Sequence, residues 1–254
     1  MTIKLVISGC SGRMGSRIGA LALADSVFTI AAALEAPGHR AVGHDVGTLL
    51  GSKPLGVTVT DHAKQALAAG DVLIEFTQPE ATLQHLEVAR ALKKPMIIGT
   101  TGFTDAQRQT IADAARSIPI VFSPNMSVGV NRLFELVQTA ARRLGPSYDV
   151  EIVEAHHRTK KDSPSGTAKR LAEVVAAARR QAPEQVPVHA IRAGDIVGDH
   201  TVVFAGPSER LELIHRAQSR DVFAQGALEA ARFIVSQPPG LYDMSHVLQH
   251  RVPR

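Results

Sequence analysis

The sequence predicts an α/β protein in which a doubly wound parallel sheet is joined to a second, smaller α+β domain with a mixed sheet. Two observations carry this prediction. From residue 3 to residue 123, short apolar runs alternate with helix-like segments, which is typical of parallel strands joined by helices. After residue 126 the strict alternation ends, and several strand-like runs follow one another. We expect a first domain over residues 1–126, completed by 221–254, and a second over 127–220.

The first expected strand, residues 3–8, runs into a glycine-rich turn that is followed by a helix over 16–24. The glycines at positions 9, 12 and 15 allow a sharp bend and a close approach of the backbone to a pyrophosphate at the positive helix end. Ser11 stands where the commoner G-x-G-x-x-G fingerprint has its second glycine. Strand, turn and helix in this order predict a Rossmann-like, dinucleotide-binding first domain.

A second expected strand, residues 28–34, ends at Glu35, twenty residues beyond Gly15. An acid at this point can bind both hydroxyls of the adenosine ribose and repels a 2′-phosphate, so NADH is slightly favoured over NADPH. Ala36 offers no guanidinium to a 2′-phosphate, although nearby cations leave NADPH open. Without the glycine turn, Glu35 would read as an ordinary surface acid.

The rest of the first domain continues the alternation, with strands expected over 71–77, 95–99 and 118–123 and helices over 79–92 and 105–117. Ligands of parallel sheets bind beyond the carboxyl ends of the strands. We therefore expect the cofactor to pass a set of residues that follow these strands: Thr77, Gly99, Thr100, Thr101, Ser123, Pro124, Asn125 and Met126. For Thr101 alone, a turn or helix cap is an equally good interpretation.

The second domain is expected to begin with an amphipathic helix over 130–144 that stops at Gly145. A strand, a helix and three more strands follow at 148–154, 167–181, 186–191, 201–204 and 211–215. An alanine-rich helix over 221–235 is expected to pack back on the first domain, and a last short helix is expected over 241–248.

The segment from Glu154 to Ala168 gathers two histidines, three cations and a Pro-Ser-Gly-Thr turn. His156 follows the apolar alternation of its strand, and a histidine can exchange a proton near neutral pH. Lys160 could donate a proton if burial beside other cations lowered its pKa. Pro164 suits the first turn of a helix, and Ser163 or Ser165 suits its cap. Ser165, Gly166 and Thr167 then form a cradle for a substrate carboxylate, although a plain helix cap explains Ser165 by itself.

Charge and composition narrow the class of partner. The net charge is +4, and Arg158, Lys160 and Lys161 alone supply three positive charges, so the basicity is local. A local cluster suits a small dianion better than a nucleic-acid backbone. Trp is absent, Tyr occurs twice and Phe eight times, so the chain offers few aromatic rings for stacking on bases. We expect a small-molecule dicarboxylate as partner, and no nucleic acid.

Cys10 is the only cysteine, so no intramolecular disulfide can form, and the sequence shows no sign of an oxidising compartment. We also find no secretory signal, no membrane span and no metal-binding motif. A cytoplasmic protein is expected.

These motifs identify a resemblance to the 4-hydroxy-tetrahydrodipicolinate reductase family, formerly called dihydrodipicolinate reductase. The family signature E-[LA]-H-H-x-x-K-x-D-x-P-S-G-T-A is matched from Glu154 to Ala168. Further matches lie nearly from end to end of the chain, at Gly9–Gly15, Phe76–Thr77, Pro79–Glu80, Gly99–Gly102, Asn125–Asn131 and Arg192–Gly198.

The resemblance implies that His156 is a proton donor or acceptor, that Lys160 is the proton donor, and that His157, Gly166 and Thr167 bind substrate carboxylates. It assigns the cofactor to Gly9, Cys10, Ser11, Gly12, Arg13, Met14 and Glu35 together with the strand-end residues given above. It also implies hydride transfer from NADH or NADPH to a ring carbon that loses its hydroxyl. The product would be tetrahydrodipicolinate, on the diaminopimelate route to lysine. Family members are usually cytoplasmic homotetramers that assemble through the second domain.

Two departures from the family pattern bear on function. Many relatives carry a longer loop before the segment that matches 186–191, and closure over the substrate can therefore differ here. Gln78 and Ala36 replace arginines of some members, which argues against strong NADPH selectivity. Two alternatives stay open: a reductase of the same fold acting on another dicarboxylate, and a catalytically silent dinucleotide sensor. The presence of His156 and Lys160 argues against the sensor, which needs no proton donor.

Overall fold

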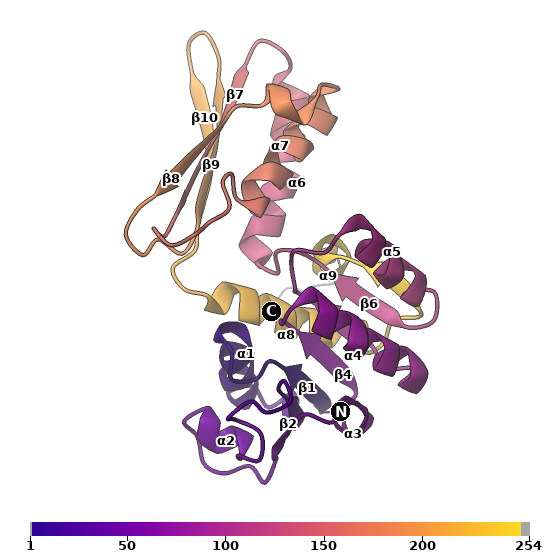
Figure 1. The fold of residues 1–254 in the computed structure, drawn as a ribbon. Helices are drawn as coiled ribbons and strands as arrows, with labels where there is room; N and C mark the ends of the chain where they lie inside the picture. Colours follow the sequence, from indigo (N-terminus) through magenta and orange to yellow (C-terminus); the bar gives the residue numbers. More distant parts are fainter. Residues whose placement is uncertain (1, 250–254) are drawn as a thin grey trace. The chain divides into compact units, whose positions relative to one another are not determined.

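The computed structural model describes residues 2–249, which form two compact units (Figure 1). The first unit contains residues 2–126 and 223–249, and the second unit contains Ser127–Val222. The predicted architecture is confirmed: the first unit has a wholly parallel sheet, and the second has a mixed one.

The sheet of the first unit has seven strands in the order β11-β6-β5-β4-β1-β2-β3. Strand order reverses at β1, since β2 lies on one side of it and β4 on the other. In such a sheet the crevice at the reversal is where ligands bind. The strand bounds are β1 Ile3–Ser8, β2 Phe28–Leu34, β3 Val59–Thr60, β4 Val72–Glu75, β5 Met96–Ile98, β6 Pro119–Phe122 and β11 Gly240–Tyr242.

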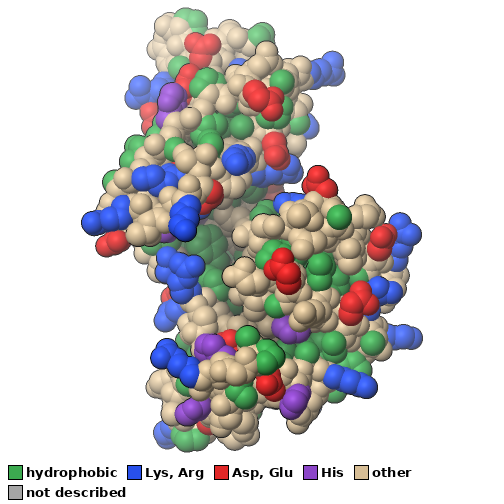
Figure 2. Space-filling model, viewed as in Figure 1, with side chains coloured by type: hydrophobic (Ala, Val, Ile, Leu, Met, Phe, Trp, Pro, Cys, Tyr) green, Lys and Arg blue, Asp and Glu red, His purple; other side chains and the backbone are tan. Residues whose placement is uncertain are grey.

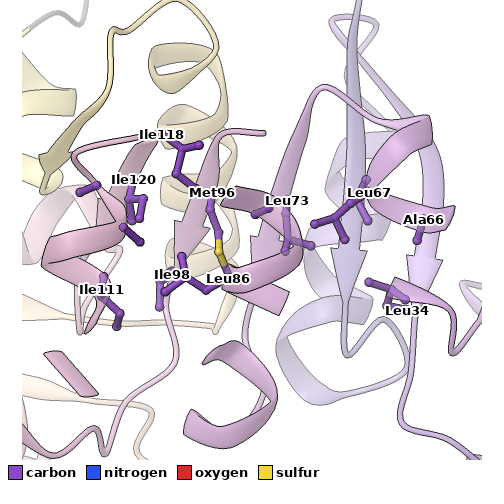
Figure 3. Packing of buried hydrophobic residues seen from close by; sticks show 14 of the residues in the cluster. Leu34, Ala66, Leu67, Leu73, Leu86, Met96, Ile98, Ile111, Ile118 and Ile120 are labelled. Carbon is purple, nitrogen blue, oxygen red and sulfur yellow. The ribbon is translucent and has the colours of Figure 1, made fainter. Parts of the chain in front are cut away.

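Helices cover this sheet, and its inner strands β4, β5 and β6 are mostly buried because both of their faces are packed. Residues from α3, α4 and α5 pack with Leu34, Leu73, Met96, Ile98 and Ile120 of the strands in one apolar cluster (Figure 3). The helix bounds are α1 Arg13–Leu23, α2 Val46–Leu49, α3 Ala63–Ala69, α4 Pro79–Leu92, α5 Asp105–Ala114, α8 Asp221–Ile234 and α9 Met244–Gln249.

The second unit is a four-stranded sheet in the order β10-β9-β7-β8, with β8 parallel to β7 and the other pairs antiparallel. Two helices cover one face of this sheet (Figure 1), where Leu133, Ile152, Leu171 and Phe204 are core residues. No helix of this unit covers the other face. The bounds are α6 Val128–Leu144, β7 Asp149–His156, α7 Gly166–Arg179, β8 Val188–Arg192, β9 Asp199–Ala205 and β10 Arg210–Arg216, with a single 3₁₀ turn at Pro183–Gln185.

Several predicted boundaries need correction. Helix α1 begins at Arg13 rather than residue 16, because Gly12 already takes the N-cap position. Strand β7 continues to His156, two residues beyond its predicted end, since it pairs with β8 up to Arg192. The segment from residue 240 to 242, expected partly as helix, is the edge strand β11. The short elements α2, β3 and α3 were not predicted at all.

None of the helices within residues 2–249 is long and apolar enough to cross a membrane. On the face shown in Figure 2, Lys and Arg side chains are interspersed with Asp and Glu in both units, as on an ordinary solvated surface.

Candidate functional site

The glycine turn joins β1 to α1 as predicted. Gly9 has a φ of +67°, a left-handed conformation that favours glycine. A Cβ atom on Gly15 would lie 2.1 Å from the carbonyl oxygen of Gly9, so α1 can approach the turn only without a side chain there. Gly12 caps α1 with no side-chain hydrogen bond, and no acid lies in the first turn. The positive end of α1 therefore suits an anion such as a pyrophosphate.

Glu35 follows β2 and is directed at this turn. Its Oε1 accepts hydrogen bonds from the N–H of Ser11 at 2.8 Å and from the Ser11 hydroxyl at 2.6 Å. Its side chain is 10% exposed, and its Oε2 lies 3.9 Å from Nδ1 of His39. One carboxylate oxygen thus holds the glycine turn, and Oε2 is left as the atom that can accept from a ribose hydroxyl.

The other turn residues predicted to bind the cofactor differ in accessibility. Cys10 is buried, and burial together with Glu35 raises the pKa of its thiol to about 12. Only its backbone can meet a ligand. Arg13 is exposed and Met14 is half-buried at the start of α1, so their side chains can reach a bound molecule.

Thr77 and Thr100 join the loops that follow β4 and β5. The N–H of Thr77 donates to Oγ1 of Thr100 at 3.0 Å, and the hydroxyl of Thr82 lies 3.0 Å from the same oxygen. Thr100 is buried, so its side chain holds the loops together, whereas Gly99 is half-buried and Thr101 is exposed. The structure therefore brings Thr77 and Thr100 together, with Thr101 at the surface.

The segment after β6 contains the last predicted cofactor residues. The hydroxyl of Ser123 donates to the carbonyl oxygen of Asn125 at 2.9 Å. Met126 is 1% exposed, and a Cβ atom on Gly226 of α8 would lie 1.7 Å from its carbonyl oxygen. The Met126 side chain is therefore part of the core, while Pro124 is exposed.

Glu75 is a buried acid that sequence reasoning missed. It is the last residue of β4, and its Oε2 lies 2.7 Å from Nδ1 of His85 on α4. Its Oε1 accepts a hydrogen bond from the hydroxyl of Thr77. The signal was available in the sequence, since a Glu that ends a run of buried apolar residues needs partners. Glu75 fixes the loop that carries Thr77.

In the second unit, His156 is the last residue of β7 and is 8% exposed on the helix-covered face. Its Nδ1 lies 2.5 Å from Oε2 of Glu154. Burial lowers the pKa of His156. The positive charges of Lys160 and Arg192 lower this pKa further, and the carboxylate of Glu154 raises it. The net pKa lies below the ordinary value, so the neutral ring is favoured at neutral pH.

Glu154 lies two residues earlier on the same face and is fully buried. Arg192 of β8 donates to both carboxylate oxygens, at 2.9 and 2.7 Å, and the N–H of Ser165 donates to Oε1 at 3.1 Å. Burial alone would raise the pKa of Glu154, but hydrogen bonds from Arg192, His156 and Ser165 outweigh burial and lower it. The acid is ionised and accepts hydrogen bonds from three separate segments.

Lys160 lies in the turn after β7, with its N–H donating to the carbonyl oxygen of His157 at 3.1 Å. Its Nζ is 2.8 Å from Oδ1 of Asp162, and its side chain is 22% exposed. Lys160 was expected beside other cations, but its nearest charged partner is the carboxylate of Asp162. His157 is half-buried, and its Nδ1 lies 2.7 Å from the hydroxyl of Thr159.

Helix α7 begins at Gly166, with Ser165 as its N-cap. The Ser165 hydroxyl accepts from the N–H of Ala168 at 3.2 Å and lies 3.2 Å from Nε2 of His200. Gly166 is exposed, and a Cβ atom there would meet no protein atom within 4 Å. The prediction that Pro164 lies in the first helical turn is wrong, because Ser165 takes the capping position after it.

These residues form one connected arrangement, since His156 and Ser165 both bind Glu154. It combines a buried imidazole, an ammonium group in the following turn and the positive end of a helix, which together can exchange protons and hold an anion. Within residues 2–249 no group of His, Cys, Asp and Glu side chains is arranged to hold a metal ion.

Sequence reasoning missed Glu154, Arg192 and His200 as parts of this arrangement. The strand period gave a signal for Glu154, because residues two apart in a strand share a face. Arg192 and His200 come from β8 and β9, and no local pattern connects them to His156 before the sheet order is known.

Comparison with known proteins gives matches over both units. Residues 3–126 match the family model described as dihydrodipicolinate reductase, N-terminus, and residues 129–248 match the corresponding C-terminus model. The chain is 48% identical to the 4-hydroxy-tetrahydrodipicolinate reductase of Anaeromyxobacter dehalogenans strain 2CP-1, over 96% of this chain and 97% of that protein. It is also 48% identical to that of Syntrophobacter fumaroxidans, over 97% and 98%.

Among solved structures, the dipicolinate-bound dihydrodipicolinate reductase of Paenisporosarcina sp. TG-14 is similar, with a TM-score of 0.79 and 25% identity over 96% of this chain and 98% of that one. An amine dehydrogenase of Mycobacterium smegmatis shares the fold, with a TM-score of 0.66 and 14% identity over 100% of this chain and 97% of that one.

Proposed function

Because this chain belongs to the dihydrodipicolinate reductase family, we propose that it reduces 4-hydroxy-tetrahydrodipicolinate to tetrahydrodipicolinate on the diaminopimelate route to lysine. It is an NAD(P)H-dependent oxidoreductase. The single observation that carries the assignment is the family match over both units. The arrangement of His156, Glu154 and Ser165 supplies chemistry that suits it.

We assign the cofactor to the first unit. The backbone from Gly9 to Met14 and the N-terminus of α1 would hold the pyrophosphate, and Oε2 of Glu35 would accept from the ribose. The loops at Thr77, at Gly99 to Thr101 and at Ser123 to Met126 follow β4, β5 and β6 at the carboxyl edge of the sheet, where the rest of the cofactor would extend. When bound, the reduced nicotinamide supplies a hydride to the ring carbon of the substrate.

The second unit would supply the proton and hold the carboxylates. Reduction adds one hydride and one proton and releases the hydroxyl as water. Lys160 is the proposed proton donor, since its ammonium lies in the turn directly after β7. A neutral His156, whose Nδ1 is directed at Glu154, would take a proton from the ring at Nε2 and return it to the departing hydroxyl, so that only the proton from Lys160 is consumed overall.

Substrate carboxylates would bind at the start of α7 and at His157. The first N–H groups of a helix have no intrahelical acceptor and carry the positive end of the dipole. Gly166 leaves open space at this helix end, so an anion can approach the backbone.

The deciding experiment is a steady-state assay with enzymatically generated 4-hydroxy-tetrahydrodipicolinate and either NADH or NADPH. Oxidation of the cofactor and formation of tetrahydrodipicolinate are expected. No turnover with this ring, together with turnover of another imine or oxo-diacid, would refute the proposed substrate.

We further propose that NADH is slightly preferred, because Glu35 lies where a 2′-phosphate would be repelled. Replacing Glu35 with Ala is expected to raise the KM for NADH more than the KM for NADPH. Since Glu35 also holds Ser11, the matched control is Ser11→Ala, which removes one hydrogen bond to Glu35 and keeps its charge. This control should change the KM for NADH and the KM for NADPH by the same factor. An unchanged preference in Glu35→Ala would contradict the ribose contact.

Finally, we propose a cytoplasmic homotetramer that binds neither nucleic acid nor membrane. The support for assembly is the face of the second sheet that carries no helix. Val153, Ile191, Val203 and Ile214 lie on this open face by strand register, and Ile191 and Ile214 are 47% and 43% exposed. The occupant we propose is a second copy of the same unit.

A further inference from the structure

Glu154 takes part in no step of the proposed reaction, yet it is bound by residues from three elements of the second unit. It has no exposed surface and accepts hydrogen bonds from Arg192 of β8 and from the backbone N–H of Ser165 at the start of α7. Its Oε2 also lies 2.5 Å from His156 of β7. A buried carboxylate is costly unless it is well paired, so a site with this many partners has been built around its charge.

The contact with His156 determines which ring nitrogen carries the proton. Glu154 is ionised and can only accept, so the neutral imidazole must place its hydrogen on Nδ1. Nε2 is then an unprotonated acceptor. It lies over Gly198, where a Cβ atom would come within 3.1 Å of Nε2, so any side chain at this position would crowd that nitrogen.

The same carboxylate fixes the start of α7. Ser165 makes two contacts that fix its position. Its N–H donates to Oε1 of Glu154, and its hydroxyl lies 3.2 Å from Nε2 of the buried His200. The orientation of the first turn of α7 therefore depends on the same acid that orients His156.

Arg192 makes the buried charge tolerable. Its two terminal nitrogens bind both oxygens of Glu154 in a bidentate pair, and one of them also donates to the carbonyl oxygen of Asp162 at 2.6 Å. Asp162 is the partner of Lys160. The pair thus connects β7 and β8 to the turn that carries the proposed proton donor.

We propose that Glu154, paired with Arg192, is a positioning residue that sets the tautomer of His156 and couples this ring to the carboxylate site at the start of α7. This inference rests on the proposed reduction for its kinetic consequences. The assignment of the tautomer does not need a substrate.

The test is Glu154→Gln, which keeps the shape and removes the charge. The groups whose charges act on His156 are Glu154, Lys160 and Arg192, with neutral His200 packed edge-on at a centroid distance of 5.2 Å. Removing the one carboxylate leaves only cations, so the pKa of His156 falls. The limb of the kcat–pH profile that belongs to His156 should move to lower pH. kcat should fall by about a hundredfold, in the range that positioned acid–base groups contribute.

The matched control is Glu173→Gln, which removes a solvent-exposed pair with Arg170 on α7 of the same unit. It should leave both kcat and the pH limb unchanged. If Glu154→Gln lowers the melting temperature but leaves the limb in place, Glu154 is only a structural residue and the proposal is overturned.

A second measurement needs no turnover and no change at Glu154. The ¹⁵N shifts of the His156 ring in the unmodified protein, assigned by comparison with His156→Gln, should show a protonated Nδ1 and an unprotonated Nε2. The opposite tautomer would refute the proposal. If the unmodified protein fails to reduce the ring substrate, the proposed function fails, while this spectrum still decides the role of Glu154.

Discussion

Three histidines, His156, His200 and His215, lie on the helix-covered side of the second sheet, and burial is the largest cause that lowers the pKa of each. The effect is greatest for His200, whose pKa falls to about 3, with His156 and other neighbours contributing. Its Nδ1 is buried without a hydrogen-bond partner among the described residues. A histidine that is neutral when buried and protonated when unfolded makes the folded state sensitive to acid.

The sign of this effect follows from proton linkage. Below its unfolded pKa of about 6.5, His200 binds a proton only in the unfolded chain, so stability is lost as pH falls from 6.5. Replacing His200 with Gln should reduce this loss between pH 6.5 and 4.5 by on the order of 2 kcal/mol. Urea unfolding of both proteins at each pH measures it. An equal slope in both proteins would mean that His200 is protonated when folded.

Lys160 is the residue whose replacement should separate chemistry from binding. Lys160→Ala is expected to lower kcat by at least about a hundredfold, because the proton donor is removed. The dissociation constant for NADH, measured by fluorescence titration, should not change. Lys161→Ala, at the exposed next position, is the control and should behave as the unmodified protein. Equal losses of kcat and cofactor affinity would instead make Lys160 a folding or cofactor residue.

At this scale the sequence predicted which residues carry chemistry better than it predicted their partners. His156 lies buried on the strand face that the apolar alternation indicates. The partners of Glu154 could not be predicted, since Arg192 is 38 residues away and becomes a neighbour only through parallel pairing of β7 with β8. Thr100 and Met126 were predicted from strand ends, and burial now limits what their side chains can contribute.

Among the elements, the turn between β1 and α1 depends on the absence of a side chain at Gly15. A methyl group at position 15 would overlap the carbonyl oxygen of Gly9. Gly15→Ala should therefore displace α1, destabilise the protein by about 1–3 kcal/mol and weaken NADH binding strongly. Thermal unfolding and NADH titration measure the two effects.

The control for this change is Gly166→Ala, at the glycine that begins α7. No protein atom lies near the added methyl there, so Gly166→Ala should leave the melting temperature unchanged. It should raise the KM for the ring substrate, because the methyl occupies the space in which a carboxylate would bind. A large fall in stability would contradict this placement of Gly166.

Prediction of elements succeeded where the pattern was long or strongly apolar, as for β1, β2 and α4. It failed between residues 45 and 70, where α2, β3 and α3 are short. There a single side chain organises the loop: the carboxylate of Asp45 accepts from the backbone N–H groups of Thr48, Leu55, Gly56 and Val57. Such a side-chain hub has no period that a sequence pattern could reveal.

At the scale of the whole molecule, the open face of the second sheet predicts assembly. Introducing Glu at Ile191 and Val203 should dissociate the proposed tetramer, since charges would replace apolar contacts between copies. Light scattering should give four times the chain mass of 27.1 kDa for the unmodified protein and less for the variant. Leu136→Glu, which alters an apolar side chain of α6 that is 57% exposed, is the control. A single-chain mass for the unmodified protein would refute the tetramer.

The first unit is built from both ends of the chain, and this has a consequence for synthesis on the ribosome. Strand β6 obtains its outer neighbour, β11, only after residue 242 has been made, whereas the second unit is one uninterrupted segment that ends at Val222. During translation the second unit can thus complete its sheet while β6 still has an unpaired edge, and such edges favour association with other chains. A nascent chain that stalls between residues 222 and 240 would contain a complete second unit and an incomplete first unit.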